Sequence, residues 1–337
     1  MSKTIVNIML ARGLGGIEQA VIDYCQAVNL AGFDTLAIIH PDAAIRKQLD
    51  ELQIPYKTLA NNGAWDIFAM LNLRFMLAQI HADITIAHGN RALSLLKYVF
   101  AKKKIVAVTH NYKIKCKNAG VIFCPTLDLI KLANSQNSEN IHHIPNTVRV
   151  PELPNIRQAH NPLIIGSMGR FVSKKGFDVF IESLAILKAR NIAFKAIIGG
   201  SGEEEENLKR IAAAKDLSEY LQFIGWVADK ANFFNAIDIF CLPSHHEPFG
   251  IVLLEAMAQG LACVSTASEG PSEIISNHED AILVSKGDGE ALAAAFVELI
   301  ENPEKRKLLG ENAYKKARQN YDIKVIAEKI KAAIDSL

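Results

Sequence analysis

The 337-residue sequence lacks the features that mark a disulfide framework, a cysteine metal site or a membrane-spanning protein. Its five cysteines are scattered, and no two stand in a Cys-x-x-Cys spacing, which indicates buried thiols in a reducing compartment. No apolar run approaches the length that crosses a bilayer, and the opening MSKTIVNIML lacks a signal peptide's apolar core and cleavage site. We therefore expect a cytoplasmic protein, with peripheral contact at the cytoplasmic face of a membrane left open.

An excess of charge of one sign is also missing. Lys and Arg number 37 against 36 Asp and Glu, a formal net charge of +1, so nothing points to nucleic acid as the partner. What the sequence does have is apolar residues, which make up half of it. That content suffices for two hydrophobic cores, and the length suits two domains of ordinary size.

Two rounds of alternating strand and helix patterns organise the sequence. In the first half, apolar runs predict strands at residues 4–10, 35–39, 56–59, 84–87, 105–109 and 121–124. In the second half, they predict strands at residues 163–168, 194–198, 221–224, 239–242, 262–265 and 281–284. This alternation predicts an α/β protein with two Rossmann-like parallel-sheet domains, each with helices on both faces of its sheet.

The predicted domain boundaries follow from a proline-rich break. Three prolines interrupt the pattern within residues 151–162, which are predicted as a linker. Residues 1–150 then form an N-terminal domain and residues 163–321 a C-terminal one. Residues 322–337 form a C-terminal helix, for which packing back on the N-terminal domain is one option. Such sheets bind ligands at the carboxyl ends of their strands, so a cleft between the domains is the expected site.

The segment at residues 244–260 is the most informative part of the chain. Pro248 and Gly250 mark a turn into a helix that is apolar nearly all round and therefore predicted to be buried. Glu255 lies in the middle of that helix, where an ionised carboxylate is costly unless something binds it. Glu247 stands at the helix entrance, and the free N–H groups there suit an anion such as a diphosphate. The alternative is that Glu247 caps the helix and Glu255 is a structural ion-pair partner.

These residues resemble a known family. The run Glu247-Pro248-Phe249-Gly250-x4-Glu255-Ala256 is similar to the EX7E signature of retaining glycosyltransferases of family 4, within glycosyl transferases group 1. Further segments match family motifs in the same order: GGxE at 15–18, GRxxxxKG at 169–176 and FxGxV at 223–227. Residues 144–148 resemble the family's IPNGV, with Thr147 in place of the glycine. The resemblance implies the GT-B fold, with an acceptor-binding N-terminal domain facing a donor-binding C-terminal domain across a cleft.

The resemblance also implies a catalytic group. It consists of Glu247, Arg170, Lys175 and His110. Arg170 and Lys175 would hold the donor's phosphates and stabilise the charge of the leaving group, which allows departure without a metal. Glu247 would contact the transferred sugar, either acting chemically or only positioning it. His110, at the end of the strand at 105–109, would assist proton transfer or orient the substrates, although a structural role is equally open.

A second set of residues is assigned to donor binding by the same resemblance. These are Gly15, Gly16, Val227, Phe249, Gly250, Ile251 and Glu255. The two oxygens of Glu255 would bind the ribose hydroxyls, and the two glycines would let the backbone approach the donor phosphate. No Asp-x-Asp occurs in the sequence, so the metal–diphosphate signature of the other major glycosyltransferase fold is missing. We expect no metal and no cofactor, because the nucleoside-diphosphate sugar is a substrate.

The predicted function is a retaining, metal-independent transfer of a sugar to an acceptor hydroxyl, in the synthesis of a cell-envelope glycan, lipopolysaccharide or glycolipid. The partners would be the nucleotide-sugar donor and a glycan or lipid-linked acceptor. Lys102–Lys104 and the alternating Lys113, Lys115 and Lys117 could touch anionic lipid headgroups or form a solvated charged face. An alternative is a non-catalytic nucleotide-sugar-binding subunit of a glycosyltransferase complex. An oxidoreductase is disfavoured, since no Gly-x-Gly-x-x-Gly fingerprint is complete.

Overall fold

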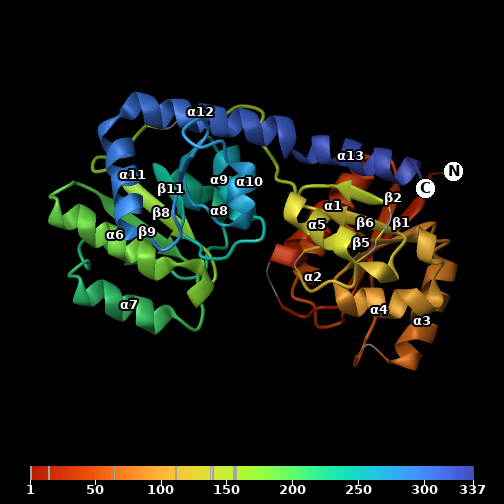
Figure 1. Cartoon of the computed structure of the whole chain (residues 1–337). Helices are drawn as coiled ribbons and strands as arrows, with labels where there is room; N and C mark the ends of the chain where they lie inside the picture. The colour runs from red at the N-terminus through yellow and green to blue at the C-terminus, as the bar shows by residue number, and fades with distance from the viewer. Residues whose placement is uncertain are drawn as a thin grey trace. The chain divides into compact units, whose positions relative to one another are not determined.

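The computed structural model describes residues 2–13, 16–63, 65–110, 112–136, 138, 140–154 and 158–337. The chain divides into two compact units (Figure 1). Unit 1 comprises Met1–Thr147 and Tyr321–Leu337, and unit 2 comprises Val148–Asn320. Gly15, one of the predicted donor-binding residues, lies outside the described residues, whereas its neighbour Gly16 is the first residue of a helix.

Unit 1, as far as it is described, is built on a seven-stranded parallel sheet. The strands are β1 (Thr4–Met9), β2 (Asp34–Ile39), β3 (Tyr56–Thr58), β4 (Ile84–His88), β5 (Ile105–Val108), β6 (Val121–Cys124) and β7 (Ile141–His143). Their order across the sheet is β3-β2-β1-β4-β5-β6-β7. Every residue of β4, β5 and β6 is buried, as expected for parallel strands covered on both faces. The sheet order makes β4 and β5 neighbours, so their carboxyl ends meet.

The helices of unit 1 follow the apolar periodicity of the sequence. They are α1 (Gly16–Leu30), α2 (Arg46–Glu51), α3 (Ile67–Gln79), α4 (Asn90–Val99), α5 (Leu127–Ser135) and α13 (Ile323–Asp335), with short 3-10 turns η1 (Lys102–Lys104) and η2 (Cys116–Asn118). Capping acids and hydroxyls fix some of their starts: Asp66 Oδ1 accepts the N–H of Ala69 at 2.9 Å, and Thr126 Oγ1 accepts that of Leu129. The C-terminal α13 packs on α1, so the last helix of the chain belongs to unit 1.

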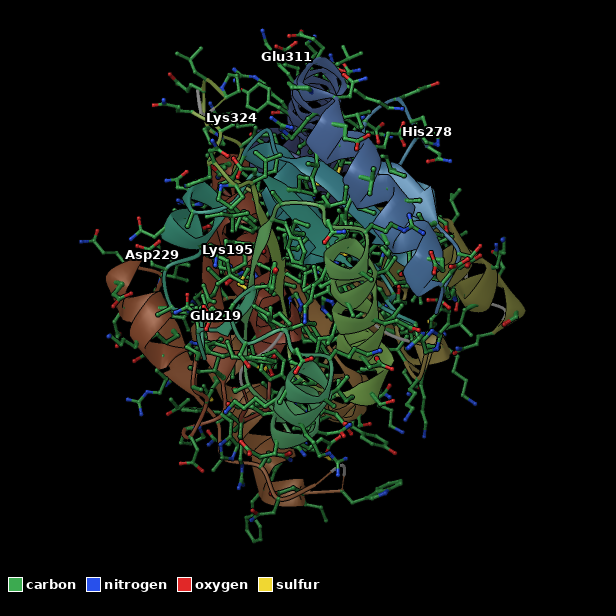
Figure 2. The ribbon with its side chains drawn as sticks, turned by 90° about the vertical axis from the view of Figure 1, so that its left-hand side faces the viewer. Lys195, Glu219, Asp229, His278, Glu311 and Lys324 are labelled. Atoms are coloured by element: carbon green, nitrogen blue, oxygen red, sulfur yellow. The ribbon has the colours of Figure 1, made fainter. Side chains whose placement is uncertain are left out.

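Unit 2 repeats the architecture with six strands in its described residues. They are β8 (Ile164–Met168), β9 (Lys195–Gly199), β10 (Leu221–Phe223), β11 (Ile239–Leu242), β12 (Ala262–Thr266) and β13 (Ile282–Val284). Their order is β10-β9-β8-β11-β12-β13, and all pair in parallel. Figure 2 shows Lys195 beside Glu219. The Lys195 ammonium donates a hydrogen bond to the backbone carbonyl oxygen of Glu219, which helps to hold the edge strand β10.

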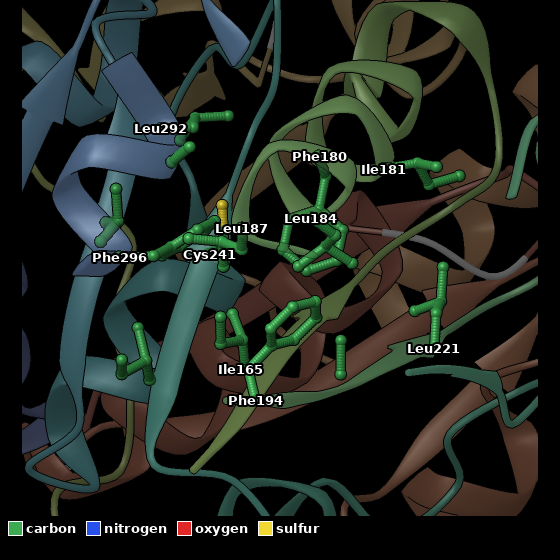
Figure 3. Packing of buried hydrophobic residues seen from close by; sticks show 14 of the residues in the cluster. Ile165, Phe180, Ile181, Leu184, Leu187, Phe194, Leu221, Cys241, Leu292 and Phe296 are labelled. Atoms are coloured by element: carbon green, nitrogen blue, oxygen red, sulfur yellow. The ribbon is translucent and has the colours of Figure 1, made fainter. Parts of the chain in front are cut away.

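The core of unit 2 lies between its sheet and helices that include α6 and α11. The helices of this unit are α6 (Phe177–Ala189), α7 (Glu205–Ala214), α8 (Lys230–Asn235), α9 (Ile251–Ala258), α10 (Glu269–Ile274), α11 (Gly289–Glu301) and α12 (Pro303–Asn320), with a 3-10 turn η3 (Ser173–Lys175). Figure 3 shows Phe180 and Leu184 of α6 and Phe296 of α11 gathered against Ile165 of β8. Burial of these large side chains holds the sheet rigid beneath the loops at its carboxyl edge.

The predicted linker is tied to unit 2. The Tyr314 hydroxyl donates to the carbonyl oxygen of Pro151 at 2.8 Å, and the backbone N–H of His160 donates to Asp238 Oδ1 at 3.2 Å. Unit 1 ends at Thr147, whose hydroxyl donates to the carbonyl oxygen of Tyr321 at 2.9 Å. The two crossings of the chain between the units therefore lie side by side.

Candidate active site

Three loops meet at the carboxyl edge of the unit 2 sheet, because β8, β11 and β12 are adjacent strands. The backbone N–H of His246 donates to the carbonyl oxygen of Lys174 at 3.2 Å, which joins the loops after β8 and β11. The Thr266 hydroxyl donates to the carbonyl oxygen of Ser244 at 2.5 Å, which joins the loops after β11 and β12. Backbone contacts thus hold together segments far apart in the sequence.

The first loop carries Arg170 and Lys175. Its final glycine, Gly176, has a φ of +66°, and a Cβ atom there would overlap the carbonyl oxygen of Pro243. Glycine is therefore needed for the close approach of the two loops. The Arg170 side chain is exposed, and no described residue lies within hydrogen-bonding or ion-pairing distance of its guanidinium. Lys175, by contrast, is partly buried.

Lys175 forms an ion pair with Glu247. Its ammonium donates to Glu247 Oε2, and the Ser244 hydroxyl reaches the same oxygen at 3.5 Å. Glu247 is buried, so the lysine supplies the positive charge that a buried carboxylate requires. The pair joins a residue predicted to hold phosphate with one predicted to contact the sugar.

Glu269, at the start of α10, supports Glu247 from the other side. Glu269 Oε2 accepts the backbone N–H of Glu247 at 3.2 Å, while Oε1 contacts His246 Nδ1 at 2.8 Å and Lys286 Nζ at 3.1 Å. Burial acts to raise the pKa of Glu269, but these N–H groups, its own backbone N–H and the lysine ammonium lower it to about 2. Glu269 is therefore a fixed negative charge that positions the Glu247 backbone.

The turn between Glu247 and α9 is tightly packed. Phe249 is buried, and Gly250 has a φ of +101°, a left-handed conformation that favours glycine. Gly270 lies against the Phe249 backbone so closely that a Cβ atom would overlap it. Ile251, half-buried, begins α9. The first N–H groups of α9 are thus held at the edge where the three loops meet.

Glu255 lies one turn further along α9 and pairs with a residue that the sequence analysis did not identify. Lys230 Nζ, at the start of α8, donates to Glu255 Oε1 at 2.6 Å. The structural ion pair left open as an alternative therefore exists. The second oxygen, Oε2, is buried and has no hydrogen-bond partner among the described residues. An unsatisfied buried acceptor costs about 1–3 kcal/mol, so this oxygen can gain from a hydroxyl donor.

Val227, the remaining predicted donor-binding residue of unit 2, lies in the loop after β10. It is half-buried and packs against Gly199 at the end of β9, where a Cβ atom would overlap its side chain. The backbone N–H of Gly200 donates to the carbonyl oxygen of Gly225 at 2.7 Å. This loop is thereby fixed to the end of β9, and it leads directly into α8 and Lys230.

In unit 1, His110 follows β5 and belongs to a hydrogen-bonded chain. Its Nε2 lies 3.0 Å from Nδ1 of His88, the last residue of β4, and His88 Nε2 lies 3.0 Å from Asn7 Oδ1. Asn7 Nδ2 donates to Thr35 Oγ1, so its oxygen is the acceptor for His88. Burial holds the pKa of His88 well below its ordinary value, an effect to which His110 adds, and lowers that of His110 to about 4.

The chain fixes the tautomers of both rings. His88 donates from Nε2 to Asn7, so in its neutral form it carries a lone pair on Nδ1. That lone pair accepts the Nε2–H of His110. The lone pair of neutral His110 therefore lies on its Nδ1, which no described side chain contacts through a hydrogen bond. His88 was missed by the sequence analysis, although a histidine at a strand end was the signal that identified His110.

The comparison with known proteins names the enzyme class. The family model for glycosyl transferases group 1 matches residues 151–316. An uncharacterized glycosyltransferase of Haemophilus influenzae is 30% identical over 301 residues, which cover 86% of this chain and 79% of that protein. The chain belongs to the glycosyl transferases group 1 family. The predicted enzyme class, a glycosyltransferase, is thereby confirmed.

Other relatives carry more specific names. The lipopolysaccharide core biosynthesis glycosyltransferase LpsE of Rhizobium meliloti is 29% identical over 311 residues, 89% of this chain and 90% of that protein. Among solved structures, Anabaena Alr3699/HepE in complex with UDP-glucose matches with a TM-score of 0.84 at 20% identity, over 99% of this chain and 100% of that one. This likeness confirms the expected GT-B fold, with its two parallel-sheet α/β domains.

Proposed function

We propose that this group 1 glycosyltransferase takes its sugar from a nucleoside-diphosphate sugar, transfers it with retention to an acceptor hydroxyl, and does so without a metal. The observation that carries the proposal is the arrangement at the carboxyl edge of the unit 2 sheet. Within the described ranges, three features lie there on segments that follow neighbouring strands: an exposed arginine without a partner, a lysine–glutamate ion pair, and a buried carboxylate with one oxygen unsatisfied.

Glu255 would bind the nucleotide's ribose. Its Oε1 is occupied by Lys230, while its Oε2 is buried and lacks a donor in the described part of the chain. A ribose hydroxyl donates one hydrogen bond, which would satisfy that oxygen. Lys230 would hold the carboxylate in its orientation, which makes it a positioning residue.

Arg170 and Lys175 would bind the diphosphate. The guanidinium is exposed and unpaired among the described residues, so it can bind phosphate without first breaking a contact. Lys175 already neutralises Glu247, and the N–H groups at the start of α9 add a partial positive charge. Glu247, held by Lys175 and by Glu269, would position the transferred sugar rather than act as nucleophile.

The transfer step would then need no protein nucleophile. The bond between the sugar's anomeric carbon and the phosphate oxygen breaks, and the diphosphate keeps the electron pair. The acceptor oxygen bonds to the same face of that carbon and gives its proton to the departing phosphate. Positive groups placed where this negative charge develops would stabilise the transition state.

For unit 1, we propose that His110 orients the acceptor hydroxyl or the donor sugar through Nδ1. The lone pair on that nitrogen is set by the chain from Asn7 through His88. The lowered pKa keeps His110 neutral near pH 7, so it accepts a hydrogen bond there. Gly16, at the exposed start of α1, would contribute a backbone approach to the donor phosphate.

The acceptor would be a glycan or a lipid-linked glycan of the cell envelope. The relatives named for lipopolysaccharide core biosynthesis include LpsE and LpsD of Rhizobium meliloti, and LpsD is 26% identical over 93% of both chains. Those names support a lipopolysaccharide-type acceptor for this chain.

A transfer assay tests the proposal. The purified protein is given a panel of nucleotide sugars with a core oligosaccharide, and nucleoside diphosphate release is measured with and without excess chelator. We expect release that persists in chelator and falls at least tenfold in Glu247→Gln, while Glu203→Gln, at an exposed position before α7, keeps wild-type activity. Donor binding without any sugar consumption would instead favour the non-catalytic subunit, and loss of activity in chelator would contradict the metal-free step.

A further inference from the structure

The helix α3 exposes an apolar face that none of the described elements of unit 1 covers. Its inner side chains, among them Leu73 and Leu77, are buried in the core. Its outer side chains, with the tryptophan just before the helix, are large, apolar and exposed: Trp65 76%, Ile67 67%, Phe68 86%, Leu71 61% and Phe75 61%. We call these five residues the α3 face. A contiguous apolar patch of this kind is a recognised mark of an interaction surface.

Cations outnumber acids in the part of the sequence that carries the α3 face. Between Trp65 and Lys117 the sequence has nine Lys and Arg but two acids, Asp66 and Asp83. Both carboxylates have partners: Asp83 accepts the backbone N–H of Thr4 and Asp66 that of Ala69, each at 2.9 Å. This stretch departs sharply from the balanced charge of the whole chain, so the surface is matched to a partner that is both apolar and anionic.

The helix α4 is a neighbour of α3 (Figure 1), and it carries a lysine beside aromatic rings. Lys97 Nζ lies 5.5 Å from the Trp65 ring centroid and 4.4 Å from that of Tyr98, which is itself exposed. The exposed η1 lysines, Lys102–Lys104, follow α4 directly. Tryptophan and tyrosine rings beside lysines are the side chains that membrane–water interfaces favour.

We propose that the α3 face docks unit 1 onto an anionic lipid surface, with α3 lying in the headgroup plane. No helix of the described chain is long and apolar enough to span a bilayer, and the 13 residues of α3 suit an interfacial position. This inference rests on the proposed function, in which the acceptor is lipid-linked. Docking on the lipid surface would bring the enzyme to that acceptor.

A second copy of the chain fits the α3 face less well. A twofold dimer through this patch would place the same cations opposite one another, with too few acids to balance them. Anionic headgroups supply the missing negative charge, each basic residue near such a surface adding to the attraction.

Vesicle co-sedimentation of the full chain tests the proposal. Vesicles are made of phosphatidylcholine alone or mixed with phosphatidylglycerol. We expect the wild type to bind the anionic vesicles and to be released by salt, and Phe68→Ser/Phe75→Ser to bind at least tenfold more weakly. The control Leu308→Ser removes an exposed apolar residue (55% exposed) from α12 in unit 2 and should bind as the wild type does.

Two readouts keep the outcomes distinct. Circular dichroism and transfer to a soluble oligosaccharide check the double variant, which we expect to be folded and active because neither phenylalanine is assigned to the catalytic group. Wild-type binding that the double variant retains would overturn the proposal, as would a patch-dependent dimer that binds no vesicles. Vesicle binding without sugar transfer to any acceptor would refute the proposed function and leave this inference standing.

Discussion

Arg170 and Lys175 are both proposed to bind the diphosphate, but replacing each by alanine should affect protein stability differently. Arg170 is exposed and has no partner within the described ranges, so its removal should change the free energy of unfolding by less than about 0.5 kcal/mol. Lys175 differs because it neutralises the buried Glu247, so Lys175→Ala should lower both stability and donor affinity.

The expected loss of affinity follows from the contact that Arg170 would make. A hydrogen bond between charged groups contributes about 1.5–3 kcal/mol, and each 1.4 kcal/mol is about tenfold in the dissociation constant. Arg170→Ala should therefore weaken nucleoside-diphosphate binding about ten- to a hundredfold, with the effect shrinking at high salt.

Calorimetric titration with the nucleotide selected by a thermal-shift panel measures this loss. Lys174→Ala is the matched control, because Lys174 is an exposed cation in the same loop to which no phosphate contact is assigned. The assignment of Arg170 to the phosphates would be refuted if Arg170→Ala left the dissociation constant unchanged. It would also be refuted if Lys174→Ala weakened binding as much as Arg170→Ala does.

Two further predictions concern titratable groups. The folded-state pKa of Glu269, about 2, lies below the ordinary value of 4.5, so its stabilisation is present above about pH 4.5 and is lost as pH falls toward 2. Over this pH range, the free energy of unfolding measured by chemical denaturation should fall by up to about 3 kcal/mol less in Glu269→Gln than in the wild type. The same pH dependence in both proteins would contradict this prediction. His88→Phe should lower kcat about tenfold or more with the donor KM nearly unchanged, because His110 loses its tautomer-setting partner. An unaltered kcat and pH profile would show that His88 is only structural.

The longer elements of the fold were predictable from the sequence. Predicted strand 4–10 is β1 at Thr4–Met9, and the predicted C-terminal helix at 322–337 is α13 at Ile323–Asp335. The strand β7 and the helix α10 were missed. β7 has three residues, too few to show alternation, and α10 contains glycine and proline, which argue against a helix.

Several residues of the site were predictable from the sequence, but the contacts between them were not. Motifs identified Lys175 and Glu247, yet they are 72 residues apart, and their pairing depends on β8 and β11 being neighbours in the sheet. Lys230 and Glu269 carry no local signal at all, because each acts only through a partner brought close by the fold. Sequence patterns report burial and periodicity along the chain, whereas these pairs arise from strand order.

The central claim is that the nucleotide binds at the carboxyl edge of the unit 2 sheet with its ribose on Glu255. Calorimetry of the selected nucleoside diphosphate and its 2′,3′-dideoxy analogue, on the wild type and on Glu255→Ala, tests it most directly. We predict that removing the hydroxyls weakens binding to the wild type about tenfold or more, since a buried acceptor then stays unsatisfied, and leaves binding to the variant unchanged. Equal losses for both proteins would show that Glu255 does not bind the ribose and would contradict the account.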